Sequence, residues 1–329
     1  MGFKIINEKL ICFDIGAAGV VPENWLKFSD QLRVFAFDAR PGSIRTPYKS
    51  NTLDLRKIET AVGGKTVKSR TLYVTKRPTG SSFYKINPCW AERLSESAYY
   101  DLVETKQLSV RTLSDVIQKD GIDLPDFIKL DIQGAEFETL EALNPIHQQN
   151  LMGLLIEVEF LPIYENQPLF TDVHQLMSKM GFILYDMRTH RSFASYNDED
   201  FGWYKNFTAY QRPSSKLSAL LYSGDALYIR DFHKRPPKSE TEVRKLTLVL
   251  LLHNYFDFAW IMVEKAKREG IIREDLEKSL KQSILGLVPK PNRSKRKGLI
   301  SKLADKFWHV IGLGQKQPAG WAREKWPSQ

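Results

Sequence analysis

The sequence predicts an α/β fold built around one mostly parallel sheet. Over the first two-thirds of the chain, short apolar runs alternate with segments of helical periodicity, which is the pattern of successive βαβ units. The first apolar run ends in Asp14-Ile15, and small residues and Pro22 follow it, the order of a strand, a tight turn and a helix. The last third of the chain loses this alternation, and we expect a helical extension there.

Seven short runs rich in branched and aromatic residues are candidate strands. They are Leu10–Ile15, Leu32–Asp38, Lys57–Val62, Phe127–Asp131, Met152–Phe160, Gly181–Asp186 and Asp225–Asp231. The candidate helices between them are Pro22–Ser29, Thr112–Lys119, Ala135–Leu143 and Thr171–Met180. Pro22 suits the first turn of a helix, and Gly121 and Gly181 suit helix ends.

Residues 63–110 interrupt this rhythm. They begin with Gly63-Gly64 and contain a turn-rich segment over residues 78–82, so we expect an inserted β-hairpin of the kind that can reach over a ligand. The expected organisation is a Rossmann-like domain over residues 1–235, a helical extension packed on it over residues 236–289, and a basic amphipathic tail over residues 290–329.

The expected extension contains an apolar run over residues 246–263. This run is about long enough to span a membrane. His253, Asn254 and Asp257 interrupt its middle, however, and polar side chains at that depth are expensive. We therefore expect a buried helix that packs on the domain.

The net charge of +9 is concentrated in the tail. Residues 290–329 hold ten Lys or Arg against Asp305 and Glu324, a net charge of +8 that leaves +1 for the rest of the chain. A nearly neutral main domain offers no footprint for nucleic acid, so we expect no such partner. The tail also places Leu299, Leu303 and Phe307 on one helical stripe, which suits peripheral contact with an anionic membrane. The alternative is a solvated tail with one helix docked on the protein.

The two cysteines, Cys12 and Cys89, are too few for a disulfide framework and lack the nearby histidines of a zinc site. The N-terminus has no apolar core of a signal peptide. We expect a cytoplasmic protein, located at the inner membrane face where the tail binds it.

A ligand site is expected in the turn after the first strand. Gly16, Ala17 and Gly19 would let the backbone approach a ligand closely, and a helix beginning near Pro22 would offer free N–H groups to an anion. A pyrophosphate and an amino-acid carboxylate both fit that description, and so does a merely tight turn.

A second acid narrows the choice of ligand. Asp38 ends the second strand about twenty residues beyond the glycine turn, where a carboxylate can accept hydrogen bonds from ribose hydroxyls. The alternative is an acid that terminates the strand in solvent. The glycine spacing departs from the G-x-G-x-x-G pattern of dinucleotide sites, which disfavours a nicotinamide-dependent oxidoreductase.

A later segment resembles a known family. Lys129, Asp131 and Gln133-Gly134-Ala135-Glu136 are similar to the central signature of the FkbM methyltransferases, Lys-x-Asp-x-Glu/Gln-Gly-Ala-Glu. Residues 156–170 and 224–231 also look like the family, so the resemblance runs from about Leu10 to Asp231. Val20 departs from it, since many methyltransferases have another glycine there.

The resemblance implies a Rossmann-like S-adenosylmethionine-dependent methyltransferase. The acid-x-Gly order at Asp14 and Gly16 is the arrangement that methyltransferases use around the methionine moiety. The residues expected to bind the cofactor are Asp14, Gly16, Ala17, Gly19, Asp38, Ala39, Ala61 and Asp131.

Three acids are candidate catalytic residues. Asp131 ends a strand at the carboxyl edge of the sheet, where ligands of open α/β folds bind. Glu157 and Glu159 lie two residues apart on a strand, so their carboxyl groups face the same side about 7 Å apart. One of the two would take the proton of a substrate hydroxyl or orient the ligand; the alternative is that they pair with Lys129 or another cation.

Other polar residues are expected to bind substrate or to pack in the fold. Glu136 and Lys129 are expected to bind substrate, although Glu136, like Glu138 and Glu141, also suits the N-terminus of a helix. His147 and His174 are expected to pack in the fold. Asp131 and Glu159 could hold a divalent metal, but carboxylates alone do not establish one, and we assign none.

The expected function is O-methylation of a hydroxyl on a sugar, glycolipid or related intermediate of glycan biosynthesis; this acceptor class comes from the resemblance alone. One alternative is a catalytically silent cofactor-binding module that docks a biosynthetic complex. The other is a nicotinamide-dependent oxidoreductase. The acceptor's identity and the oligomeric state stay open.

Overall fold

The structure is a computed structural model that describes residues 4–19, 21–46, 52–95, 97–193 and 219–289. Val20 and the expected basic tail over residues 290–329 lie outside the described residues.

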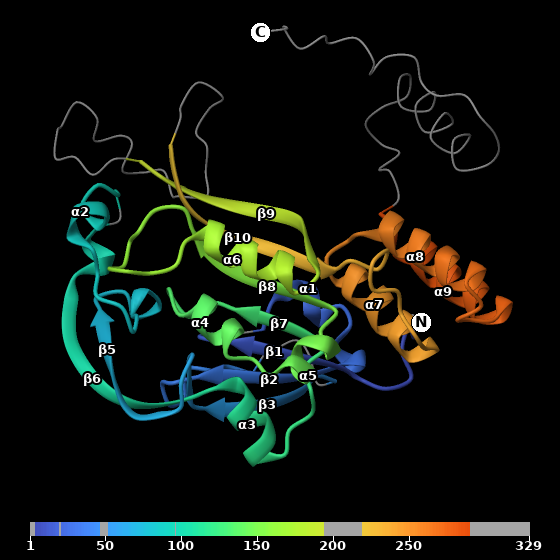
Figure 1. Cartoon of the computed structure of the whole chain (residues 1–329), viewed down its shortest axis with the longest axis horizontal. Coiled ribbons are helices and arrows are strands. Elements are labelled where there is room, and N and C mark those ends of the chain that lie inside the picture. Colours follow the sequence, from blue (N-terminus) through green and yellow to red (C-terminus); the bar gives the residue numbers. More distant parts are fainter. Residues whose placement is uncertain (1–3, 20, 47–51, 96, 194–218, 290–329) are drawn as a thin grey trace, which may run out of the picture. The chain divides into compact units, whose positions relative to one another are not determined.

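A seven-stranded sheet with the order β3-β2-β1-β7-β8-β10-β9 forms the centre of the described fold (Figure 1). Its strands are β1 (Leu10–Ile15), β2 (Leu32–Asp38), β3 (Asp54–Glu59), β7 (Phe127–Leu130), β8 (Gly153–Glu159), β9 (Phe182–Ser192) and β10 (Leu220–Arg230). All neighbours pair in parallel except β10, which is antiparallel to both β8 and β9. The predicted Rossmann-like, mostly parallel α/β fold is confirmed.

Most strand positions agree with the sequence-based expectation. β1 and β2 have the predicted bounds, whereas the run predicted at Lys57–Val62 is divided at Thr60 between β3 and β4 (Ala61–Val62). β9 and β10 are longer than predicted because each extends to pair with the other.

The helices and short turns of helix connect these strands. They are α1 (Glu23–Leu26), η1 (Ser29–Gln31), α3 (Leu113–Asp120), α4 (Glu136–Glu141), α5 (Pro145–Asn150) and α6 (Phe170–Lys179). α3 begins after Thr112, whose side chain accepts a hydrogen bond from Asp115 N, and ends at Gly121 in the left-handed conformation, as its sequence predicts. α1 is only one turn long, shorter than the predicted Pro22–Ser29.

The two faces of the sheet differ in chemistry. Along each strand, alternate residues face opposite sides. Phe13, Phe37, Ile128 and Ile156 join an apolar core with residues of α3, α4 and α6 on one side. Their sequence neighbours therefore face the other side, and several of these are charged, which places a polar wall on that second face.

The inserted segment is a hairpin, as predicted. β5 (Val67–Thr75) and β6 (Leu102–Arg111) pair in antiparallel fashion, and β4 adds to β6 in a separate three-stranded sheet. The segment between them contains η2 (Pro78–Gly80), α2 (Pro88–Ala91) and η3 (Ser97–Tyr100). Figure 1 shows the hairpin beside one end of the main sheet.

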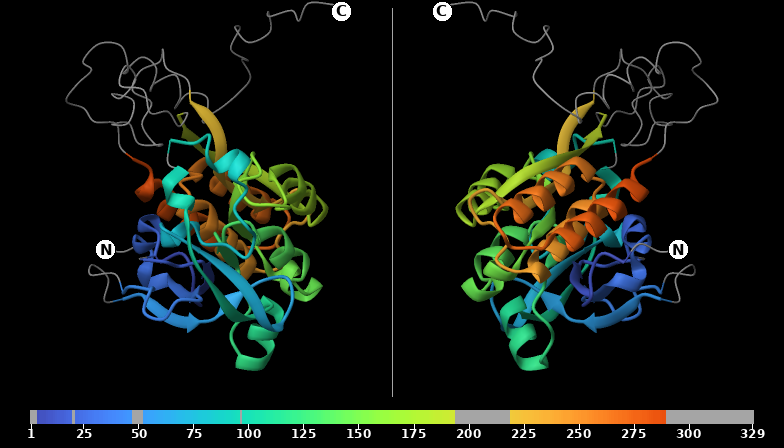
Figure 2. Two further views of the ribbon diagram at one scale, coloured as in Figure 1. Left: turned by 90° about the vertical axis from the view of Figure 1, so that its left-hand side faces the viewer. Right: turned by 90° about the vertical axis from the view of Figure 1, so that its right-hand side faces the viewer.

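Three helices form the C-terminal part of the described chain: α7 (Glu240–Leu252), α8 (Phe256–Arg268) and α9 (Glu274–Leu287) (Figure 2). The apolar run over residues 246–263 is thus divided between α7 and α8, with Asn254 in the left-handed conformation at the turn. In the described part of the chain, no helix has both the length and the apolar character needed to cross a membrane.

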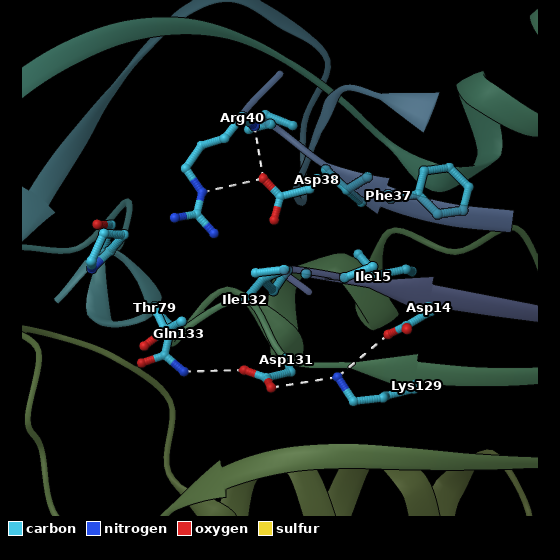
Figure 3. Close-up of a pocket in the computed structure, with 18 of the residues that line it drawn as sticks. Asp14, Ile15, Phe37, Asp38, Arg40, Thr79, Lys129, Asp131, Ile132 and Gln133 are labelled. Atoms are coloured by element: carbon cyan, nitrogen blue, oxygen red, sulfur yellow. Dashed lines mark hydrogen bonds and ion pairs between the residues drawn. The ribbon is translucent and has the colours of Figure 1, made fainter. Parts of the chain in front are cut away.

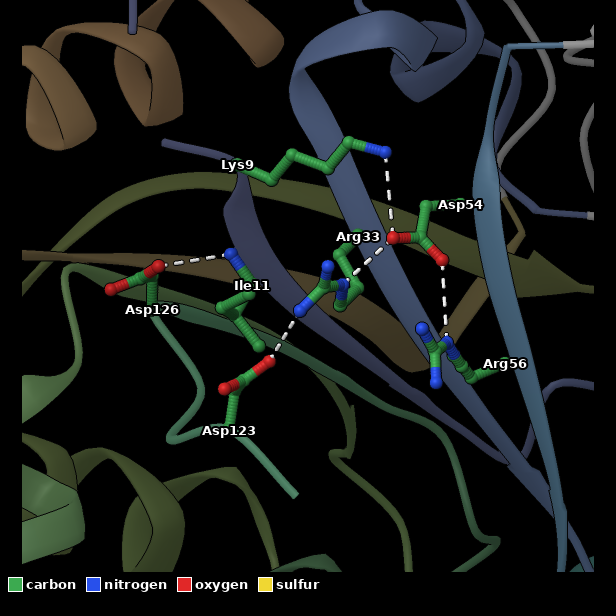
Figure 4. A network of polar contacts seen from close by, with 7 residues as sticks. All are labelled: Lys9, Ile11, Arg33, Asp54, Arg56, Asp123 and Asp126. Atoms are coloured by element: carbon green, nitrogen blue, oxygen red, sulfur yellow. Dashed lines mark hydrogen bonds and ion pairs between the residues drawn. The ribbon is translucent and has the colours of Figure 1, made fainter. Parts of the chain in front are cut away.

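A buried acid, Asp126, ties α7 to the sheet. Figure 4 shows its hydrogen bond with Ile11 of β1. Asp126 is fully buried just before β7 and accepts hydrogen bonds from Ile11 N at 2.9 Å and Lys245 Nζ at 2.9 Å. Arg33 lies nearby between Asp54 and Asp123. Each charged side chain named here therefore has a partner of opposite charge, and the partner of Asp126 is Lys245 of α7.

We predict that Lys245→Met will lower the free energy of unfolding by about 2–3 kcal/mol, because it leaves the carboxyl group of Asp126 buried without its cation. Urea denaturation monitored by circular dichroism measures the change. The matched control is Lys278→Met, which removes an exposed ion pair with Glu274 on α9 and should leave the midpoint unchanged. Equal midpoints for both variants would contradict the structural role of Lys245.

Candidate functional site

A cavity of about 580 Å³ opens on the polar face of the sheet, within the range of roughly 300–1,000 Å³ usual for ligand sites. The carboxyl ends of β1, β2 and β7 form one side of it, and the inserted segment forms another through Leu72, Thr79 and Phe83. Seven of the eight residues predicted to bind a cofactor line this cavity: Asp14, Gly16, Ala17, Asp38, Ala39, Ala61 and Asp131. Gly19, the eighth, is not among the lining residues.

The turn after β1 depends on glycine at one position. Gly16 has φ +82°, a conformation that residues with a Cβ atom rarely adopt. A Cβ atom there would lie 1.8 Å from the carbonyl oxygen of Asp131. Gly16 therefore allows the ends of β1 and β7 to meet, and this contact closes the floor of the cavity.

The N–H groups of this turn are not available to an anion. Gly16 N and Ala17 N both donate to Phe37 O, at 3.0 and 2.9 Å, and Gly19 N donates to Ser43 O at 3.1 Å. Ala18 N lies 2.8 Å from Gly16 O. The sequence predicts free N–H groups at the helix that begins near Pro22. Within the turn itself, the carbonyl groups of Phe37 and Ser43 accept from three of the four N–H groups, and the fourth, Ala18 N, bonds within the turn.

Asp38 lies on the wall of the cavity opposite Asp131 (Figure 3). One oxygen, Oδ1, accepts a hydrogen bond from Arg40 N at 2.7 Å and lies 3.4 Å from Arg40 Nε. The side chain is 8% exposed, so it is not the solvent-facing strand terminator that the sequence left possible. It faces the cavity as a carboxylate held in place by its own turn.

Lys129 joins the two acids on the cavity floor (Figure 3). Its Nζ lies 3.4 Å from Asp14 Oδ1 and 3.5 Å from Asp131 Oδ2. Burial opposes a charged lysine, but the carboxylates of Asp131 and Asp14 outweigh burial and raise the pKa of Lys129. Burial raises the pKa of Asp14 despite the nearby ammonium. For Asp131 burial is outweighed by Lys129 and by hydrogen bonds, which lower its pKa.

A second cavity of about 240 Å³ adjoins the first. The two share Thr79, Asp131 and Gln133 as lining residues. Carboxyl and aromatic side chains dominate the rest of its wall: Glu157, Glu159, Tyr99, Tyr100, Tyr164, His190, Tyr222 and Ser223. A molecule in the first cavity can therefore meet a molecule in the second beside Asp131.

The strand register arranges residues that line the two cavities in two rows. In the first row, Glu159 of β8 lies opposite Ser223 of β10, which lies opposite His190 of β9. In the second row, Asp225 of β10 lies opposite both Glu157 and Arg188. Residues directly opposite one another on paired strands have neighbouring side chains, so each row crosses three strands on one face.

Burial favours the protonated form of both glutamates. Burial, and then the charge of Asp131, raises the pKa of Glu157 well above its ordinary range. Burial, and then Glu136 and Asp131, does the same for Glu159. The alternative that these acids pair with Lys129 is not what the structure shows, since the contacts of Lys129 are with Asp14 and Asp131.

Gln133 fixes the boundary between the cavities. It has a left-handed backbone, with φ +57°, and its Nε2 donates to Asp131 Oδ1 at 3.1 Å and to Glu157 Oε2. Its Oε1 accepts a hydrogen bond from the Tyr164 hydroxyl at 2.7 Å. The inserted segment binds here as well, because Ser82 Oγ donates to Gln133 O at 2.5 Å.

Glu136 lies beneath this loop and lines neither cavity. Its carboxylate accepts hydrogen bonds from Ile132 N at 2.7 Å and Gly134 N at 2.8 Å. Its observed contacts therefore order the loop, and its expected contact with substrate stays a prediction. The same holds for Lys129, which lines the first cavity between two acids.

Glu138 has a role that the sequence did not indicate. Instead of only facing the helix N-terminus, it accepts hydrogen bonds from Arg70 of β5, Tyr84 Oη at 3.2 Å and Gly64 N at 3.3 Å. These contacts fasten the inserted segment to α4.

His147 and His174 make contacts within the fold, whereas His190 lines the second cavity. His147 lies 3.3 Å from Ser114 Oγ, and His174 lies 3.1 Å from the Tyr228 hydroxyl; neither lines the two cavities. His190, which the sequence did not single out, does. Among the residues that the structure describes, no three His, Cys, Asp or Glu side chains form a group that could hold a metal ion.

The site residues missed by sequence reasoning are Arg188, His190, Ser223 and Asp225 on the last two strands. Alternation along β10 could have placed Ser223 and Asp225 on one face. No sequence pattern indicates that β10 lies between β8 and β9, and without that order the rows cannot be assembled.

Comparison with known proteins gives one family. The family model described as "Methyltransferase FkbM domain" matches residues 14–184, slightly more than half of the chain. No curated protein matches.

Two solved structures are similar in part. A precorrin-6y C5,15-methyltransferase from Geobacter metallireducens GS-15 is 12% identical, with 68% of this chain and 80% of that chain covered and a TM-score of 0.26. A putative hemolysin from Streptococcus thermophilus is 12% identical, with 77% and 69% covered and a TM-score of 0.25. Likeness at this level carries no argument about fold or function.

Glu136 gives the fold a specific pH dependence. Burial raises its pKa to about 7 from 4.5, although the N–H groups of Ile132 and Gly134 oppose the rise. An acid with a raised pKa in the folded state stabilises the fold fully below its unfolded pKa, and this contribution is lost as the pH rises through the folded value.

We predict that the stability advantage of the wild type over Glu136→Gln will shrink between pH 4.5 and pH 7.5. Urea denaturation of both proteins across this range measures it. Glu141→Gln, at an exposed position of the same helix, is the control and should follow the wild type. An advantage that grows with pH would contradict the protonated state of Glu136.

Proposed function

Given that the chain belongs to the FkbM methyltransferase family, we propose that it transfers a methyl group from S-adenosylmethionine to a hydroxyl of a sugar, glycolipid or related biosynthetic intermediate. The observation that carries this proposal is the pair of cavities that meet at Asp131, Gln133 and Thr79. Transfer between two bound molecules needs a donor site and an acceptor site whose reactive atoms can be brought together.

The first cavity suits S-adenosylmethionine. When bound, this cofactor supplies an electrophilic methyl group on a sulfonium. Asp38 is placed to accept hydrogen bonds from ribose hydroxyls, and Asp14 and Asp131 offer negative charge to the cationic parts of the molecule. Ala61, Val62 and Leu72 add an apolar wall suited to a purine ring. A dinucleotide fits less well, because the N–H groups of residues 16–19 are already bonded within the chain.

The second cavity suits an acceptor with several hydroxyls. The ionised form is favoured for Asp131 and the protonated form for Glu157 and Glu159, so the three groups suit both accepting hydrogen bonds from hydroxyls and donating to them. The rings of Tyr99 and Tyr222 add aromatic surface on which the C–H face of a sugar can pack. This mixture of carboxyl groups and aromatic rings favours a carbohydrate acceptor.

The chain's own residues bind and orient the acceptor. In this proposal Asp131, Glu157 and Glu159 hold the acceptor hydroxyl toward the first cavity. Gln133 links Asp131 to Glu157 and so fixes their relative positions. Pre-positioning of this kind is the main contribution a protein makes to a displacement reaction.

The competing functions give different ligand profiles. A nicotinamide-dependent oxidoreductase would bind NAD in preference to S-adenosylmethionine and S-adenosylhomocysteine. A catalytically silent module would bind the sulfur compounds but transfer no methyl group. Calorimetric titration with all three compounds separates the first case, and a transfer assay separates the second.

We predict that Asp38→Asn will raise the dissociation constant for S-adenosylmethionine about tenfold, since a neutral amide makes weaker hydrogen bonds to the ribose than a carboxylate. Calorimetry measures the constant. Asp30→Asn, at an exposed position of η1, is the control and should bind as the wild type does. Equal binding by both variants would remove Asp38 from the cofactor site.

We predict that Asp131→Asn and Glu159→Gln will each reduce transfer of labelled methyl to glycan extracts by at least about tenfold, because both alter the acceptor wall. Glu274→Gln on α9 is the exposed control. Alkaline hydrolysis of the product separates a stable methyl ether from a methyl ester, which releases methanol. Transfer to esters alone, or unchanged transfer in both variants, would overturn the proposed acceptor chemistry.

A further inference from the structure

We propose that Ser223, His190 and Asp225 form a relay that takes up the proton of the acceptor hydroxyl during methyl transfer. This inference rests on the proposed function and adds three residues of the last two strands to it.

The contacts of His190 carry the inference. Its Nδ1 lies 3.1 Å from Ser223 Oγ, and its Nε2 lies 3.3 Å from Asp225 Oδ2. The imidazole is therefore placed between a hydroxyl and a carboxylate. With a proton on Nε2 directed to Asp225, Nδ1 is left as an acceptor for the Ser223 hydroxyl, the same logic by which a carboxylate sets the tautomer of a histidine in hydrolase triads.

Two of these residues line the acceptor cavity. His190 and Ser223 are both in the wall of the second cavity, and Asp225 is in the wall of the first. His190 is 7% exposed and Ser223 is 3% exposed, so an acceptor hydroxyl reaches them only from within the cavity.

Two of the three relay residues lie on β10, the strand that runs antiparallel to its neighbours β8 and β9. Ser223 and Asp225 lie two residues apart on β10 and share a face, and His190 lies directly opposite Ser223 on β9. Glu159 lies opposite Ser223 on the other side. The relay thus continues the carboxyl wall of β8 across the next two strands, β10 and then β9, which are spaced about 4.8 Å apart.

The other ionisable groups of the cavity are poorly suited to take up this proton. Burial favours the protonated forms of Glu157 and Glu159 by raising the pKa of each. Asp131 is already bound by Lys129 and Gln133, and a carboxylate stabilised in this way is a weak base. Burial also raises the pKa of Tyr164. An imidazole is the side chain that exchanges protons near neutral pH.

The proposed step transfers one methyl group to the acceptor oxygen and removes one proton from it. As the acceptor oxygen forms its bond to the methyl carbon, the carbon–sulfur bond breaks and its electron pair stays on sulfur, which changes from a sulfonium to a thioether. The acceptor proton passes to Ser223 Oγ while the Ser223 proton passes to His190 Nδ1. The imidazolium that results lies beside the carboxylate of Asp225 until solvent removes the proton.

The charged and ionisable groups around His190 come from several elements. Asp225 and Tyr222 face it from β10, Glu159 shares the cavity from β8, Arg77 lines the same cavity from the inserted segment, and Arg188 lies two residues away on β9. Asp225 is the acid in contact with the imidazole, so removal of its charge is the change that should most alter the proton affinity of His190.

Kinetic measurements on single variants test the relay. We expect His190→Gln to lower kcat about 100-fold, with calorimetric binding of S-adenosylmethionine unchanged, and Ser223→Ala to lower it by at least about tenfold. Asp225→Asn should move the acidic limb of the kcat/KM profile to lower pH, because the imidazolium loses its carboxylate. The matched controls are His147→Gln and Ser114→Ala, which alter a histidine–serine contact that lines neither cavity.

A second measurement does not require turnover. Nitrogen-15 NMR of histidine in the wild-type protein without cofactor should show His190 as the Nε2–H tautomer, with its signal assigned by loss in His190→Gln. Its titration should shift to lower pH in Asp225→Asn and stay unchanged in Ser114→Ala. A different tautomer, or a titration that ignores Asp225, would overturn the relay.

The outcomes separate the two proposals. Absence of methyl transfer to any hydroxyl by the wild type would overturn the proposed function, and the NMR result would still decide the geometry of the relay. Transfer by the wild type with the same rate and pH profile in His190→Gln would overturn the relay alone.

Discussion

The ion pairs of the half-buried Lys129 are the interaction on which the rest of the site depends. The lysine lies between Asp14 at the end of β1 and Asp131 just beyond β7, and Asp14 is its register partner across those strands. Without the cation, the buried carboxyl group of Asp14 and the half-buried one of Asp131 would face each other, an arrangement that favours protonation of one or separation of the strands. Because Asp131 lines both cavities, the position of Lys129 also affects the place where the two cavities meet.

Strand alternation lets one sheet carry an apolar core and a polar wall. Phe13 and Ile128 face the core, while Asp14 and Lys129, their immediate neighbours, face the cavities. The inserted segment covers the polar face, and Ser82 binds the loop carbonyl of Gln133 there. This cover is what buries the acids and raises the pKa of most of them. A chain with the same sheet but no insertion would present the same acids to water, where they would be ordinary anions.

Sequence reasoning reached the cofactor side of the site because that side depends on local patterns. Strand, turn and acid recur at Asp14 and Asp38, and the carboxyl ends of adjacent parallel strands meet at one edge. It did not predict that the N–H groups of the glycine turn are already bonded, because two of their acceptors, Phe37 O and Ser43 O, belong to a distant segment. It assigned Glu138 to a helix terminus because the partner, Arg70, lies in the insertion. Long-range partners have no local signature.

The part of the second cavity that β9 and β10 form was beyond sequence reasoning for a topological reason. His190 and Ser223 are 33 residues apart in the chain and meet only because β10 runs antiparallel between β8 and β9. A shift of one residue in that register would turn the side chains of β10 to the apolar face. The segment matched by the family model ends at Leu184, so it contains Asp14, Lys129 and Asp131 but not the three relay residues. Most residues that line the first cavity thus lie in the part that the family model matches, whereas the wall of the second cavity combines Glu157 and Glu159 from that part with His190 and Ser223 from beyond it.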